Sequence, residues 1–228
     1  MQNWKKYGFE FLSIFVAVIT AFALNNWNDN RRDSYAEVKI LTEILNGLHE
    51  DVLDVGSNAD GHKLGIRACK FWRRVFNDEP VELDSLRDYY HIITRDFVSI
   101  QNTSGYETLK SRGFELISND SLRKKIISLY EYDYQFLKKL EEEYYELQFQ
   151  ENYFDEINRA IAPHFTYNDT GHMTDLALPL RLPQAERNLL LSYLWKIQGN
   201  RRFILQLYQQ VEGNIDTLIG EIEQELKE

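Results

Sequence analysis

An apolar segment close to the N-terminus constrains this chain more than any other feature. Residues 9–24 read FEFLSIFVAVITAFAL, which is sixteen residues with one charge, at Glu10. The segment alone is slightly short for a bilayer crossing, but Tyr7 and Trp27 lie twenty residues apart, or about 30 Å along a helix. Its apolar surface extends all round, which is typical of a membrane helix and not of a helix in a soluble core. The sequence therefore predicts a transmembrane helix over residues 9–27.

The residues that flank this segment are of the kinds that hold a helix at a membrane interface. Aromatic rings and cationic side chains favour the headgroup layers on the two sides of a bilayer. Glu10 lies in the first turn of the predicted span, so we expect it to be membrane-embedded with its carboxylate near the interface. The expected membrane-interface anchors are Trp4, Lys5, Lys6, Tyr7, Trp27, Arg31 and Arg32.

A cleaved signal peptide is a second interpretation of the same segment. Lys5 and Lys6 would form its basic region, and residues 21–23 (Ala-Phe-Ala) resemble a cleavage site of small residues. The bulky residues 25–27 (Asn-Asn-Trp) and the charge inside the apolar region favour a signal-anchor that stays attached. The sequence thus predicts a single-pass membrane protein, with an N-terminal tail over residues 1–8.

The orientation of the span follows only from small asymmetries. The positive charges on its two sides are nearly balanced, so the positive-inside rule decides little. A short tail before a signal-anchor usually stays in the cytoplasm, which favours an exported C-terminal domain. We expect a protein of the bacterial inner membrane with residues 28–228 outside the cytoplasm.

The composition of the remaining chain is that of a folded, acidic domain. The net charge is −10, and the first 33 residues carry four positive and three negative charges, so −11 remains for the rest. Such a charge repels phosphate backbones and anionic headgroups, which argues against nucleic-acid binding and against membrane-surface binding. The single cysteine, Cys69, excludes an intramolecular disulfide, and its apolar neighbours predict a buried thiol.

Apolar residues at intervals of three and four predict an all-α domain. We expect an elongated antiparallel helical bundle with coiled-coil-like packing after the span, and no strands. The longest helix is expected over residues 120–162, an irregular loop over 163–183, and a last helix from Pro183 to the end. Three glycines over 56–65 should loosen the chain after the first helix of the domain. The helix-packing seam of that first helix is expected at Val38, Leu41, Leu45, Leu48, Val52 and Val55.

Two stretches resemble a group of uncharacterised bacterial single-pass membrane proteins, a family of unknown function. The first is the apolar span that runs into NNWNDNRRD and then into EVKILTEILNGLHED, and the second is SGYETLKSRGFELISNDSLRKKIISLY, residues 104–130. In that group an N-terminal span ends in an Asn-Asn-Trp-Asn-like box, which is followed by a Leu-rich helix. The resemblance covers about a third of the chain. It implies the single-pass topology and no particular chemistry.

Candidate catalytic and metal-binding residues do not form a motif. The loop PHFTYNDTGHMTD holds His164, Asp169, His172 and Asp175, which are metal-ligand types, but their spacing matches no closed site. His62 and His91 stand alone and are expected to be either exposed or satisfied in the core. We interpret Asp51 as part of a polar helix tail, and Glu141 and Arg201 as solvated surface charges. We predict no enzyme activity, no metal and no cofactor.

Two functions remain as hypotheses. The first is a membrane-anchored structural or interaction protein, which self-associates or scaffolds a membrane or envelope partner. The second is an extracytoplasmic helical module that senses a small ligand between its helices. The aromatic residues that could line such a pocket are Tyr89, Tyr90, Tyr144, Tyr145 and Trp195.

Overall fold

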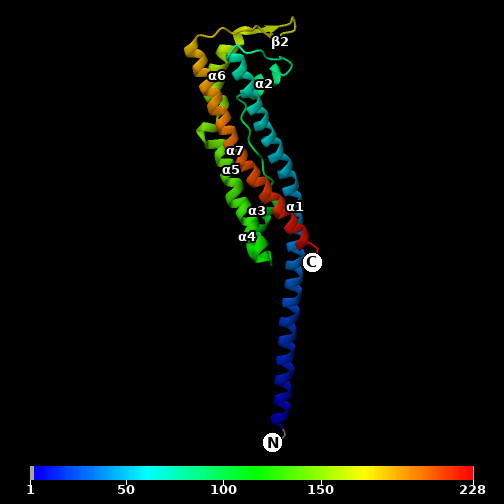
Figure 1. Ribbon diagram of the computed structural model, residues 1–228. Helices are drawn as coiled ribbons and strands as arrows, with labels where there is room; N and C mark the ends of the chain where they lie inside the picture. Colours follow the sequence, from blue (N-terminus) through cyan, green and yellow to red (C-terminus); the bar gives the residue numbers. More distant parts are fainter. Residues whose placement is uncertain (1–2, 228) are drawn as a thin grey trace.

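The longest element of the computed structural model is a single helix, α1, which runs from Asn3 to Phe76. The structure describes the backbone of residues 3–227 and the side chains of residues 7–227. At 1.5 Å per residue α1 is about 110 Å long. Its N-terminal part extends alone, whereas its C-terminal part forms one side of the folded domain (Figure 1). The apolar segment and the first helix of the domain are therefore one element.

A second long helix, α7 (Gln184–Glu225), runs antiparallel to α1 along the domain (Figure 1). Three helices follow one another on the other side of α7, and two short helices pack against α1. Helices make up 79% of the chain, so the all-α prediction is confirmed. The remaining α-helices are α2 (Leu86–Ile92), α3 (Ser104–Arg112), α4 (Asp120–Ser128), α5 (Tyr134–Glu143) and α6 (Phe149–Ile161).

Single turns link some of these helices. Gly113, with a φ of 103°, ends α3, and the Asn119 side chain accepts two backbone N–H bonds at the start of α4. Both ends follow from residue type, because glycine tolerates a positive φ and asparagine caps free N–H groups. The linking turns are 3₁₀ at Phe114–Leu116, Tyr145–Leu147 and Ala162–His164, and a π turn at Leu129–Asp133.

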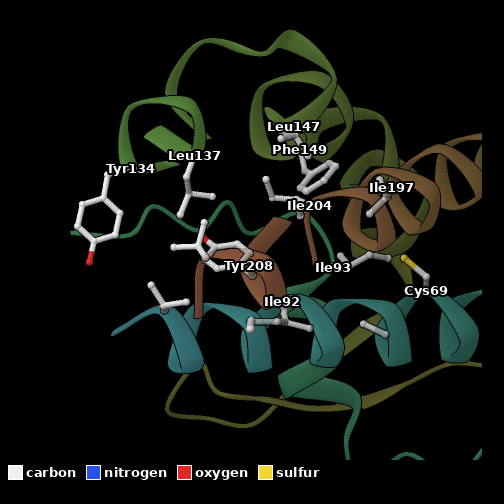
Figure 2. Close-up of a cluster of buried hydrophobic side chains, with 14 of the residues drawn as sticks. Cys69, Ile92, Ile93, Tyr134, Leu137, Leu147, Phe149, Ile197, Ile204 and Tyr208 are labelled. Atoms are coloured by element: carbon white, nitrogen blue, oxygen red, sulfur yellow. The ribbon is translucent and has the colours of Figure 1, made fainter. Parts of the chain in front are cut away.

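The hydrophobic core lies between α1, α7 and the three helices α4 to α6. Figure 2 shows Tyr208 and Ile204 of α7 between Leu137 of α5 on one side and α1 on the other. Burial of an aliphatic side chain such as Leu137 or Ile204 contributes roughly 1.5–3 kcal/mol to the free energy of unfolding. The core therefore binds the two long helices to each other along most of the domain.

The glycines over 56–65 do not interrupt α1, contrary to the sequence prediction. A Cβ added to Gly65 would lie 2.4 Å from Nε of Arg201, and one added to Gly61 would lie 2.3 Å from the Phe97 ring. These two glycines serve as points of close approach to other segments, and packing outweighs their weak helix propensity. The helix consequently continues to Phe76.

The predicted helix over 120–162 is instead three helices, which is a second correction. The chain leaves the α conformation at Tyr144 and returns to it at Phe149. The Asp96 carboxylate accepts the backbone N–H of Phe149 at 2.7 Å and so caps the start of α6. The break thus depends on a residue about fifty positions away, which local periodicity does not show.

The 163–183 loop contains two strands, although no strands were predicted. Strand β1 (Phe165–Tyr167) pairs antiparallel with β2 (Met173–Leu176), and Phe165 lies opposite Leu176. The strands have three and four residues, too few for a period-two pattern to stand out. This hairpin lies at the end of the domain that is farthest from the N-terminus (Figure 1).

Candidate functional site

The most unusual part of the domain is the extended segment 95–103, which links α2 to α3 next to α1. It belongs to no sheet, so its backbone N–H groups need other acceptors. Carboxylates supply them: Glu141 accepts from Ser99 at 3.0 Å and Asp54 accepts from Ile100 at 2.9 Å. Asp51 accepts from Asn102 at 2.7 Å. Acidic side chains of α1 and α5 therefore hold this segment in place.

Glu141 of α5 connects three parts of the structure. Its carboxylate accepts bonds from the backbone and hydroxyl of Ser99, and from the hydroxyl of Tyr208 on α7. Glu141 is 4% exposed, and this burial raises the pKa of its carboxyl to about 6. The sequence interpretation of Glu141 as a solvated charge is therefore wrong. Its neighbours on α5, Glu142 and Glu143, are exposed as expected.

Asp51 of α1 has a similar role toward the same extended segment, where it bonds Asn102. It is fully buried and accepts two bonds from Asn102 and one, at 2.7 Å, from the hydroxyl of Tyr134. Burial is the main cause of a raised pKa for its carboxyl. Asp51 is thus a core residue and not part of a polar helix tail, which corrects the sequence interpretation.

Arg201 of α7 is fully buried, although the sequence suggested a solvated arginine. Its Nη2 donates to the carbonyls of Ile92 and Ile93 at 3.1 Å and of Arg95 at 2.9 Å. These carbonyls lie where α2 ends and helical N–H donors run out, although that of Ile92 also accepts the backbone N–H of Arg95 at 3.3 Å. The guanidinium also stacks on the Phe149 ring, 4.4 Å from its centroid. Arg201 of α7 therefore caps the C-terminal end of α2.

His62 of α1 completes this cluster. Its Nδ1 lies 3.1 Å from Nη1 of Arg201. Burial, and secondarily the charge of Arg201, lower the pKa of His62 to about 3. The ring is consequently neutral, and because a guanidinium only donates, Nδ1 is the accepting nitrogen. Burial also lowers the pKa of Arg201, to about 10, so Arg201 keeps its charge.

We define the buried polar cluster by five residues, each at most 5% exposed: Asp51, His62, Ser99, Glu141 and Arg201. A histidine, a serine and carboxylates in one region invite comparison with a catalytic site. In catalysis, however, the base contacts the nucleophile, whereas here His62 contacts Arg201 and Ser99 contacts Glu141. Burial also keeps solvent and substrate away. The arrangement is that of a structural frame for the 95–103 segment.

The predicted span is present as an isolated apolar helix. Its most apolar stretch of 18 residues has a mean hydropathy of 1.9, and none of these residues is buried. Helix α1 is therefore long and apolar enough to cross a membrane. Tyr7 and Trp27 are each 62% exposed, and Glu10 is exposed near the start of the helix. The side chains of Trp4, Lys5 and Lys6 lie outside the described residues. Arg31 lies over the Trp27 ring, and Arg32 pairs with Asp29 at 3.5 Å.

The helix-packing seam of α1 faces the core of the domain, but the buried positions differ slightly from the predicted ones. Leu41, Leu48 and Val55 are at most 1% exposed, whereas Leu45 and Val52 are half-buried and Val38 is 52% exposed. The fully buried positions between them are Ile44 and Asp51. The same stripe continues through Ala59 to His62. Most of the seam is therefore covered by this chain itself.

The polar loop and the aromatic residues lie apart from the buried cluster. His164, Asp169, His172 and Asp175 are distributed along the hairpin, and no group of three or more metal-ligand residues forms within the described part of the chain. Tyr90 lines a cavity of about 320 Å³ together with His91, His172 and Arg87, at the hairpin end. Tyr89 lines a wider hollow beside the turn after α1. Tyr144, Tyr145 and Trp195 are exposed.

Comparison of the chain with protein-family models, curated proteins and solved structures finds no match. Functional inference therefore depends on the geometry of the molecule.

Proposed function

We propose that this protein is a membrane-anchored helical interaction protein. One span in a bacterial inner membrane would hold an elongated helical bundle upright and present its hairpin end to a protein partner in the envelope. The observation that carries the proposal is the continuity of α1, which passes from the exposed apolar segment into the core of the domain without a break. An interaction role requires a domain held at a fixed place beside the membrane and does not require catalytic residues.

The junction between span and domain has the composition of a stiff connection. Residues 27–36 contain neither glycine nor proline, and they are helical throughout. Ala36 is already buried, so the domain begins nine residues after Trp27. From Trp27 to the end of α1 at Phe76 the helix rises about 73 Å. A rigid spacer of this length would set the height at which the hairpin end meets its partner.

Exposed apolar groups at the hairpin end favour protein recognition there. Tyr167 of β1 is 58% exposed and Leu178, just after β2, is 38% exposed. Aromatic residues with a polar end are enriched in protein interfaces. The partner would be a different protein or a second copy of this chain. A second copy would need a surface other than the seam, since most of the seam residues are already packed within the chain.

Membrane extraction tests the anchoring part of this proposal. The full chain should stay in the membrane pellet after alkaline carbonate treatment. A variant with V16K and I19K should be released, because lysine at the centre of a span costs roughly 2.5–3.5 kcal/mol per residue. A wild-type chain in the supernatant, or a shortened chain that lacks the first 23 residues, would contradict the anchor and support the cleaved signal peptide.

Photo-crosslinking in intact membranes tests the interaction part. A crosslinking residue in place of Tyr167 should capture a protein, and the same residue in place of Lys196, an exposed position on α7, should not. Equal products at both positions would argue against an interface at the hairpin. Labelling of the two positions from outside the cells also reports on which side of the membrane the domain lies.

The ligand-sensing alternative is supported by the cavity beside Tyr90, His91 and His172. Its volume of about 320 Å³ falls at the lower end of small-molecule sites. A thermal-shift screen of small anionic and aromatic ligands with wild type and with H172A tests this alternative. Stabilisation of the wild type that H172A abolishes would favour it over the interaction role.

A further inference from the structure

A cleft between α1 and α3 lies just beyond the predicted span. It has a volume of about 250 Å³, and its lining includes Arg32, Tyr35 and Lys39 of α1 and Arg112 of α3. Helix α3 packs against α1 with Gly105 beside Ile44, and its other end, at Arg112, lies beside the first turns of the domain. The cleft is thus open at the end of the domain that faces the N-terminal segment.

The lower part of the cleft lies at the height expected for the headgroup layer of a bilayer. Arg32 follows Trp27 by five residues and Lys39 follows it by twelve, which places them about 8 and 18 Å farther along α1. The headgroup region of one leaflet is about 5–8 Å thick. Because Trp27 would mark the interface, the lower part of the cleft would lie at the level of the lipid phosphates, within reach of the long cationic side chains.

The charge of the cleft is opposite to that of the domain. Three of its lining residues are cationic and one, Glu43, is anionic, whereas residues 34–228 carry a net −11. Glu43 lies 4.0 Å from Lys39, and Asp29 and Asp33 lie 3.5 and 3.9 Å from Arg32. The side chain of Arg112 is exposed and forms no hydrogen bond or ion pair with any described side chain, although Asp33, Glu37 and Glu115 line the hollow on its other side. A guanidinium without an ion pair among the described residues therefore remains where the acidic domain comes closest to the predicted span.

We propose that this cleft binds the phosphate of an anionic phospholipid headgroup. This inference rests on the proposed membrane anchoring. Arg112 binds the phosphate as a charged, multidentate donor, Arg32 completes the site from α1, and Tyr35, which is 75% exposed, lines the cleft beside them. The bound lipid would hold the base of the domain against the leaflet and offset the repulsion that its acidic surface meets there.

Native mass spectrometry of the full chain in mixed micelles tests the proposal. The micelles contain equal amounts of phosphatidylglycerol and phosphatidylcholine, and the retained lipids are counted. Wild type should retain phosphatidylglycerol in preference. R112Q should lower this preference about fivefold, as expected for one cation of roughly 1 kcal/mol near an anionic surface. R112K, which keeps the charge but not the fork of donors, should fall between R112Q and wild type, and K196Q, which removes an exposed cation near the start of α7, should match the wild type.

Each alternative outcome has a definite meaning. Equal retention by R112Q and wild type overturns the lipid site, whatever the extraction experiment shows. Loss of the retained lipid to millimolar glycerol phosphate indicates a site for soluble phosphates and also overturns it. Failure of the anchor appears separately, as release of the full chain by carbonate. Arg112 is exposed, so its variants should fold, and circular dichroism of each variant verifies this.

Discussion

The guanidinium of Arg201 on α7 lies 3.1 Å from Nδ1 of His62 on α1, and both side chains are buried. Neither residue forms an ion pair with a carboxylate among the described residues, which is uncommon for a buried arginine. Three backbone carbonyls at the end of α2 and the ring of Phe149 take the place of an anion. The charge of Arg201 is therefore solvated by fixed dipoles within the domain.

Substitution of Arg201 should destabilise the domain strongly. R201Q removes a donor from three backbone carbonyls, of which that of Ile92 keeps the N–H of Arg95, and each buried group left unpaired costs roughly 1–3 kcal/mol. We expect a loss of about 3 kcal/mol in the free energy of unfolding, measured by urea titration of the full chain in mild detergent. The matched control is R202Q, because Arg202 is exposed and should matter by less than about 0.5 kcal/mol. Equal effects of the two variants would contradict the assignment.

His62 should make the domain sensitive to acid. Its pKa is about 3 in the folded chain and 6.5 ordinarily, so the unfolded state binds the proton first as the pH falls. Stability due to His62 is then present above pH 6.5 and decreases below it, by about 1.4 kcal/mol per pH unit. Between pH 7.5 and 5.0, wild type should lose about 2 kcal/mol relative to H62Q. Parallel curves for the two chains would refute a buried, neutral histidine.

Glu141 should act in the opposite direction. Its folded pKa of about 6 lies above the ordinary 4.5, so the folded state binds the proton first. The free energy of unfolding therefore rises as the pH falls from above 6 to below 4.5, by about 2 kcal/mol for this group. E141Q should remove that gain, and E142Q, at an exposed neighbour, should retain it. A wild-type gain equal to that of E141Q would show that Glu141 is not responsible.

Two glycines of α1 should respond to alanine with opposite signs. G65A places a Cβ 2.4 Å from Arg201, whose guanidinium is fixed by carbonyls, so we expect a loss of about 1–3 kcal/mol. G56A has open space around it and should gain roughly 0.5–1 kcal/mol from helix propensity. Thermal unfolding of both variants measures the difference. A stabilising G65A would mean that Arg201 is more mobile than its contacts imply.

The fold could be predicted from sequence wherever the signal was local. The apolar run before Trp27, the cap at Asn119 and the stop at Gly113 each depend on a few neighbouring residues, and the helical class followed from the spacing of Leu and Ile. The break before Phe149 depends on Asp96, which comes from another part of the chain. No reading of residues 120–162 alone contains that contact.

The buried polar cluster was missed because charged residues were assumed to be solvated. A signal was nevertheless present in the spacing. Arg201 stands between Ile197 and Ile204 on the apolar stripe of α7, and Asp51 stands between Leu48 and Val55 on that of α1. A charge in such a position points to a buried polar contact. Its partners, such as the carbonyls at the end of α2, still could not be named from the sequence.

We propose that one helix both crosses the membrane and carries the hairpin end far above it. Energy transfer from a site-specific dye to acceptor-labelled lipids measures that height directly. Cys69 is buried and its thiol pKa is raised to about 11 by that burial, so introduced cysteines can be labelled selectively. We expect strong transfer from Y35C, near the predicted span, and almost none from T170C in the hairpin, at the end of the domain where α1 stops about 73 Å beyond Trp27. Comparable transfer from both positions would contradict this proposal, because the domain would then lie flat on the membrane or the apolar segment would not be inserted.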